Sequence, residues 1–146
     1  MKIIVIVPVL AALFTANVYA ECKNSKTVFS CTTTKGKQIE VCDADKTIDY
    51  SFGKAQGKPE ISIQVPRDQA STFQWAGIGS SISYAVDIPN KNTTYNVFWN
   101  ADKNSEDHPV EAGVNVLVNK ELVATVNCSG KDIVNNIEGV NLKPTE

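Results

Sequence analysis

Apolar and polar residues alternate with a period of two along most of this 146-residue chain. Successive side chains of a β-strand point to opposite faces, so this alternation is typical of strands that bury one face. No window keeps a helical period over several turns, and the best helical fragment is the short stretch 68–73. The alternating runs predict eight strands, at residues 29–32, 38–41, 48–52, 60–65, 82–88, 95–99, 114–118 and 122–128.

Residues that favour turns lie in the gaps between these runs, as at Lys35-Gly36, 57–59, Pro89-Asn90 and Asn119-Lys120. No internal repeat, linker or low-complexity tract interrupts the pattern. We therefore expect residues 21–146 to form a single all-β domain, an antiparallel meander of eight strands. Such a meander closes most simply as a small β-barrel or a sandwich, because both limit exposed strand edges.

The last hairpin tests the register of this pattern. A two-residue loop at Asn119-Lys120 would place Leu122 and Val116 on opposite faces. A three-residue loop from Asn119 to Glu121 would pair Val118 with Leu122 and Val116 with Ala124, and would gather the apolar residues on one face. The longer loop is therefore predicted.

The first twenty residues have the pattern of a secretory signal peptide. Lys2 gives a basic start, residues 3–14 form an apolar run, and 18–20 supply the small or slender side chains of a cleavage site. The apolar run is too short to span a bilayer. A lipid anchor on Cys22 is disfavoured because Glu21, rather than a small residue, precedes it. We expect cleavage after residue 20 and a periplasmic or secreted protein without a membrane anchor.

Four cysteines follow the predicted cleavage site, and an even number in an exported domain predicts two disulfides. In the alternating pattern Cys31 and Cys128 face inward and Cys42 faces outward. Of the three possible pairings, this parity favours Cys31 with Cys128 and Cys22 with Cys42. A zinc site is disfavoured because no C-x-x-C pair exists.

No set of residues points to catalysis, so the chain is not expected to be an enzyme and no cofactor or metal is expected. The single histidine, His108, lies in the polar stretch 104–109, where adjacent residues of one extended loop cannot converge as a triad. Residues 43–54 begin like a calcium loop but lack its glycine and its final glutamate. The stretch 77–80 has neither the lysine nor the helix of a phosphate-binding loop.

The formal net charge is only −2, and no run of Lys and Arg appears, so nucleic acid is not expected as a partner. Trp75 lies outside the clear strand pattern. A large aromatic residue at such a position either plugs one end of the fold or anchors a contact with a partner.

Two short motifs and the predicted architecture resemble the bacterial periplasmic lysozyme inhibitors. The stretch Ser80-Ser81-Ile82-Ser83-Tyr84 is similar to the S-G-x-x-Y loop that this family inserts into the lysozyme cleft, with Ser81 in place of glycine. Thr34-Lys35-Gly36 matches a supporting T-K-G stretch. The two stretches occur in the opposite order to the family, and the alternation points Tyr84 inward.

The resemblance implies a non-enzymatic protein that blocks a cell-wall hydrolase through a surface loop, or a periplasmic immunity protein that neutralises a toxin. The implied contact residues are Ser80, Ser81, Tyr84 and Lys35, with Trp75 as a further anchor. Two alternatives are a periplasmic β-barrel that carries a small molecule or glycan, and a structural protein of the envelope. The sequence leaves the oligomeric state open.

Overall fold

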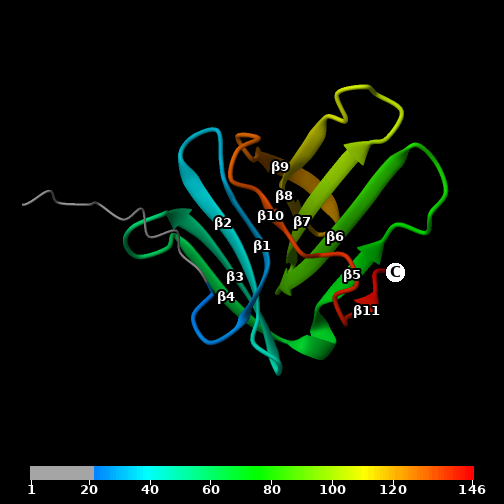
Figure 1. Ribbon diagram of the computed structural model, residues 1–146. Coiled ribbons are helices and arrows are strands. Elements are labelled where there is room, and N and C mark those ends of the chain that lie inside the picture. Colours follow the sequence, from blue (N-terminus) through cyan, green and yellow to red (C-terminus); the bar gives the residue numbers. More distant parts are fainter. Residues whose placement is uncertain (1–21) are drawn as a thin grey trace, which may run out of the picture.

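The structure is a computed structural model, and it describes residues 22–146. The predicted signal peptide therefore lies outside the described residues. Two β-sheets face one another (Figure 1). The first has the order β10-β1-β2-β3-β4 and the second the order β11-β5-β6-β7-β8-β9. The first sheet contains β1 (Lys26–Thr32), β2 (Lys37–Asp43), β3 (Thr47–Lys54), β4 (Ile61–Pro66) and β10 (Val134–Asn135). The second contains β5 (Ser71–Gln74), β6 (Ser81–Asn90), β7 (Thr93–Asp102), β8 (Val110–Val118), β9 (Glu121–Asn127) and β11 (Lys143–Pro144).

The all-β class is confirmed, whereas the single meander of eight strands and the closed barrel are wrong. The described residues form eleven strands in two sheets, and only β11 pairs in parallel, with β5. The extra strands are β5, β10 and β11, of four residues or fewer, and so short a strand leaves almost no alternation to read. The helical fragment at 68–73 is also wrong: the one-turn 3-10 helix η1 (Arg67–Gln69) leads into β5, whose Thr72 is buried.

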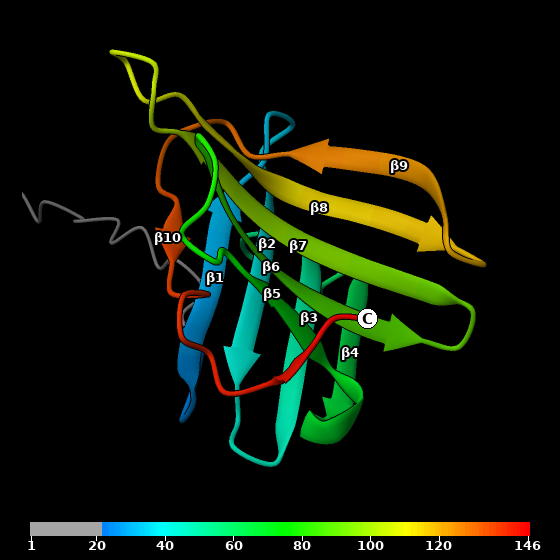
Figure 2. The same cartoon turned by 90° about the vertical axis from the view of Figure 1, so that its right-hand side faces the viewer.

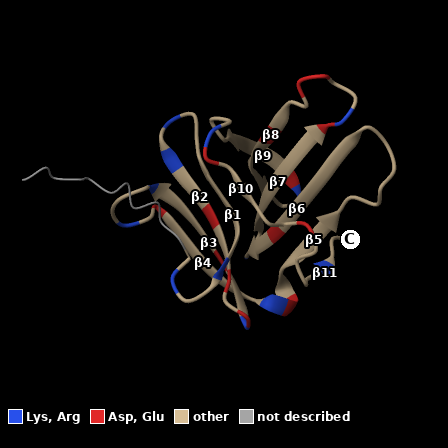
Figure 3. Cartoon of the chain, viewed as in Figure 1, with Lys and Arg blue, Asp and Glu red and all other residues tan. Residues whose placement is uncertain are grey.

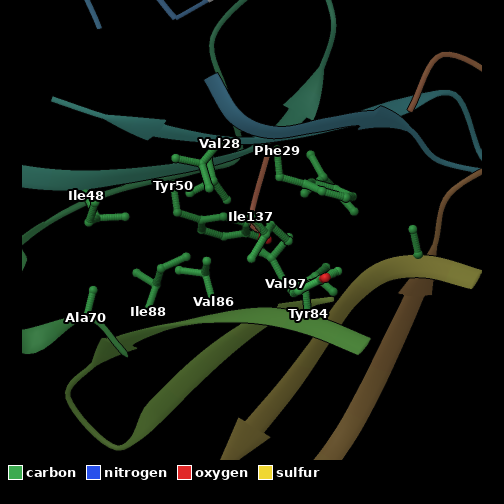
Figure 4. Close-up of a cluster of buried hydrophobic side chains, with 14 of the residues drawn as sticks. Val28, Phe29, Ile48, Tyr50, Ala70, Tyr84, Val86, Ile88, Val97 and Ile137 are labelled. Atoms are coloured by element: carbon green, nitrogen blue, oxygen red, sulfur yellow. The ribbon is translucent and has the colours of Figure 1, made fainter. Parts of the chain in front are cut away.

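Side chains from both sheets fill the space between them (Figure 4). The aromatic rings of Tyr50, on β3, and Tyr95, on β7, stack across this interface with their centroids 4.8 Å apart. The largest fully buried side chains are Tyr50, Phe29, Ile39, Ile48, Ile88, Ile137, Val41, Val86, Val97, Val114 and Cys31. The core is thus a layer between two sheets, as in a sandwich.

The C-terminal segment crosses an open side of the sandwich. After β9 the chain pairs with β1 through β10 and then with β5 through β11, so one segment joins both sheets (Figure 2). Ile137, between these two short strands, is fully buried in the core. The C-terminal segment is therefore part of the packed core.

Arg67 ties this segment to the first sheet. Its guanidinium donates hydrogen bonds to the carbonyl oxygens of Asp45, at 2.5 Å, and Asn141, at 2.6 Å, and to the carboxylate of Asp43. Burial of the Asp43 carboxyl opposes its ionisation, but the Arg67 side chain and the backbone N–H of Asp45 outweigh this and hold the pKa of Asp43 below its usual value. One side chain thus joins the β2–β3 turn, η1 and the C-terminal segment.

Both predicted disulfides are confirmed. Cys31 and Cys128 join β1 to the residue that follows β9, with their Cα atoms 5.9 Å apart. Cys22 and Cys42 join the N-terminal residues to β2, with their Cα atoms 5.6 Å apart. The first disulfide links the two sheets, whereas the second joins the N-terminal residues to the first sheet.

The register of the last hairpin is right at one pair and wrong at the turn. Val116 pairs with Ala124, as predicted, but Val118 pairs with Glu121 rather than Leu122. The turn has two residues, Asn119 and Lys120, both with positive φ, as a type I′ turn requires. A bulge between Val116 and Leu117 then shifts the register. It allows Val116 to pair with Ala124 as predicted, but it leaves Leu122 opposite Leu117, so the apolar residues are not all gathered on one face.

Candidate functional site

The β5–β6 loop, residues 75–80, projects from one end of the second sheet (Figure 1). The indole Nε1 of Trp75 donates a hydrogen bond of 2.9 Å to the carbonyl oxygen of Ile78. The backbone N–H of Lys103, in the β7–β8 loop, donates one of 2.9 Å to the carbonyl oxygen of Ser80. The Lys103 ammonium also lies 5.0 Å from the centre of the Trp75 ring. The first contact joins two residues within the β5–β6 loop, and the other two join this loop to Lys103 of the β7–β8 loop.

Ile78, at the tip of this loop, is 83% exposed, the highest value among the large hydrophobic side chains of residues 22–146. It is flanked by Gly77 and Gly79, whose φ angles of 82° and 91° are in the region that favours glycine. The backbone around Ile78 therefore has a conformation that other residues would adopt only with strain. An apolar side chain held out to solvent on such a backbone is suited to contact a partner.

The structure places the predicted contact residues in three different locations. Trp75, Ser80 and Ser81 lie in or beside the β5–β6 loop, and both serines are exposed. Tyr84 is only 7% exposed and points into the core, where its ring lies 6.2 Å from that of Trp99. Burial raises the pKa of the Tyr84 phenol, and a hydrogen bond to Glu138 raises it further. Tyr84 is therefore a core residue, as its inward parity in the sequence indicated, and it offers little surface to a partner.

Lys35 belongs to a different part of the surface. It is exposed in the β1–β2 turn, which is closed by a hydrogen bond of 2.7 Å from the Thr33 N–H to the Lys37 carbonyl oxygen. This turn belongs to the first sheet, whereas the β5–β6 loop belongs to the second (Figure 1). The structure therefore does not unite the two stretches that carry the family resemblance into one site.

The polar stretch around His108 does not form a catalytic triad. The Nδ1 atom of His108 lies 3.3 Å from the backbone carbonyl oxygen of Asp102, rather than beside a carboxylate. The His108 backbone N–H donates to the carbonyl oxygen of Ser105, which closes a turn. A histidine base needs a carboxylate or similar group to orient its ring toward a nucleophile, and these contacts do not provide one.

The residues that resemble a calcium loop already have other partners. Asp43 binds Arg67 and the backbone N–H of Asp45, and Asp49 accepts hydrogen bonds from Thr47 and Gln64. Ligand-type atoms of Cys22, Glu40 and Cys42 lie within 4.8 Å of one another, but both sulfurs are in the disulfide. A disulfide sulfur is not the thiolate that binds metals.

Two residues of the β5–β6 loop region, Ile78 and Lys103, were not predicted from the sequence to be contact residues. An isolated isoleucine between two glycines, outside any alternating run, is a signal that could have marked the loop tip. Lys103 carries no such signal, because its contact with Trp75 joins two loops that are distant in sequence.

Lys and Arg residues are spread over the turns rather than gathered on one face in the view of Figure 3. Among the described residues no helix is long and apolar enough to cross a membrane. The two disulfides suggest an oxidising compartment. No protein-family model, curated protein or solved structure matches this chain.

Proposed function

We propose that this chain is an exported, non-enzymatic binding protein that contacts a partner protein through the β5–β6 loop. The exposed Ile78 on its fixed backbone carries the proposal. A small rigid apolar tip with polar neighbours is the usual composition of an interface centre, and Ser80 and Ser81 supply those neighbours. Because contacts of Trp75 and Lys103 hold the loop in place, little conformational entropy is lost on binding.

A cell-wall hydrolase is the proposed partner, on the basis of the Ser80–Tyr84 resemblance and the predicted export signal. Inhibition would come from the loop tip and the two serines, which would fill the substrate cleft, with Tyr84 supporting the loop from the core. A toxin delivered to the periplasm is the related alternative. The interior of the fold speaks against a ligand carrier, since large side chains such as Tyr50 and Phe29 are fully buried between the sheets.

The test is inhibition of bacterial lysis. The processed protein, recovered after export from an expression host, is added in micromolar excess to lysozymes of several types, and residual lytic activity is followed. We expect inhibition of at least one type, lost in Ile78→Asp because a charge would then enter an apolar contact. Val123→Asp, at a side chain on β9 that is 60% exposed, is the matched control and should inhibit fully. Failure of the unmodified protein against every lysozyme would exclude lysozymes as the partner.

A further inference from the structure

A row of polar side chains crosses the outer face of the second sheet, well away from the β5–β6 loop. Asp87 on β6, Asn96 on β7, Asn115 on β8 and Thr125 on β9 lie directly opposite one another in the strand register. Hydrogen bonds of 2.6, 3.1 and 2.8 Å join them in that order. On β6, β7 and β8 the neighbouring residues Val86, Val97 and Val114 are buried in the core, so the side chains of the four residues, here called the polar row, share the outer face of the sheet.

The C-terminal residues extend this row at one edge of the sheet. The Thr145 hydroxyl donates a hydrogen bond of 2.8 Å to the second carboxylate oxygen of Asp87, and it lies 3.1 Å from the hydroxyl of Ser71. Polar side chains therefore run without a break from the C-terminal segment across β5, β6, β7 and β8 to β9. Strands lie about 4.8 Å apart, so the polar row alone spans roughly 14 Å.

Most of the polar row lies in a hollow of about 800 Å³. The hollow is bounded by the C-terminal residues Lys143–Glu146 on one side and by the β8–β9 hairpin on the other. Pro89, Leu117 and Leu122 supply apolar surface beside the polar floor, and Leu122 is 62% exposed. Hollows of several hundred cubic ångströms with a few convergent polar groups are the usual form of small-ligand sites.

The hydrogen bonds within the polar row orient each side-chain amide and leave part of its hydrogen-bonding capacity unused. Asn96 and Asn115 each donate one N–H to a neighbour, which leaves the second N–H of each amide group directed away from that bond. Asp87 accepts from Asn96 and Thr145, and a carboxylate can accept about four hydrogen bonds. Donors and acceptors thus repeat along the floor of the hollow at the strand spacing.

The ligand that these groups suit is a saccharide without net charge. Sugar hydroxyls donate and accept at once, which matches a floor of alternating amide, carboxylate and hydroxyl groups, and the C–H face of a sugar ring packs on apolar side chains such as Leu117 and Leu122. The charged lining residues comprise both signs, with Asp87 and Glu146 against Lys120 and Lys143, so neither an anion nor a cation is favoured. We propose that this hollow on the outer face of the second sheet binds a neutral oligosaccharide.

Titration calorimetry with three neutral tetrasaccharides, cellotetraose, maltotetraose and fully N-acetylated chitotetraose, using the processed protein, tests the proposal. We expect at least one to bind, and the side-chain amide NMR signals of Asn96 and Asn115 to shift on binding. Asn115→Ala should weaken binding about tenfold, the effect of losing one ordinary hydrogen-bonding group. Asn100→Ala, on the outer face of β7 but outside the hollow, is the matched control and should bind as tightly as the unmodified protein.

Leu122→Asp supplies a second test. Asn115→Ala could weaken binding by destabilising the fold, but Leu122 is largely exposed, so its replacement should not affect folding. It should weaken saccharide binding while leaving thermal unfolding unchanged. Absence of binding by all three tetrasaccharides at millimolar concentration would overturn the proposal, as would binding that Asn115→Ala and Leu122→Asp leave unaltered. Ile78→Asp should bind saccharide normally, so this result is separable from that of the lysozyme assay.

Discussion

Replacing Cys31 and Cys128 together by alanine removes the disulfide that links the two sheets. These cysteines are 97 residues apart, whereas Cys22 and Cys42 are 20 apart. In the chain-entropy description, closing the longer loop stabilises the fold by about 4.7 kcal/mol and closing the shorter one by about 3.3 kcal/mol. The longer disulfide should therefore contribute about 1.4 kcal/mol more to the free energy of unfolding.

The two disulfides form a matched comparison. Each contains one buried cysteine, Cys31 or Cys42, and one half-buried partner, so the packing lost with the sulfur atoms is similar in both alanine pairs. The difference between the two pairs then reports mainly on loop closure. Cys31 and Cys128 also hold the two sheets together, so losing their disulfide should lower the free energy of unfolding further, in the same direction as the loop-closure effect.

Urea unfolding followed by tryptophan fluorescence measures both variants against the unmodified protein. We expect Cys31→Ala/Cys128→Ala to have the lower midpoint, and each variant to show a somewhat larger m value because its unfolded chain is less constrained. Treatment of the unmodified protein with a reductant should destabilise it at least as much as either pair. An equal or greater loss from Cys22→Ala/Cys42→Ala would refute the loop-closure reasoning.

Three further predictions follow from the packing. Arg67→Lys keeps the charge but loses the planar hydrogen-bonding group, and should lower the free energy of unfolding by about 1–2 kcal/mol in chemical denaturation. Because the pKa of Asp43 is lowered in the folded state, the contribution of the Asp43 carboxylate to stability should be present above about pH 4 and lost as the pH falls further. Gly113→Ala would place a Cβ only 2.2 Å from the carbonyl oxygen of Val126, so β8 and β9 must separate; a loss of roughly 1–3 kcal/mol is expected, and an unchanged melting temperature would contradict this contact. Burial, and secondarily Tyr95, raises the pKa of the Tyr50 phenol, so stability should hold below about pH 10 and fall above it, and Tyr50→Phe should reduce that fall in unfolding measured across alkaline pH.

Side-chain alternation predicted the strands wherever a strand is long enough to show it. The runs at 48–52 and 82–88 correspond to parts of β3 and β6, and the inward parity of Cys31 was enough to select the right disulfide partner. The division into two sheets could not be read in this way. It depends on which strands lie side by side, and β10 pairs with β1 across about a hundred residues of sequence.

The candidate sites were less accessible to sequence reasoning than the fold. Ser80 and Ser81 were singled out from a short motif, but the exposure of Ile78 depends on how the β7–β8 loop supports the β5–β6 loop. The polar row was missed for a related reason. Asn96 and Asn115 are ordinary outward-facing residues in the alternation, and they meet only because the register of β7 and β8 brings them opposite one another.

The pairing of β1 with β10 has a consequence for the order in which the chain can fold. β1 is the first of the described strands along the chain, yet its Phe29 pairs with Asn135, more than a hundred residues later. Ile137, which fills the core beside them, comes later still. A chain in which residues 134–137 are not yet in place therefore has an incomplete core and an unpaired edge on β1, so this closing step depends on contacts of high sequence separation, which form slowly.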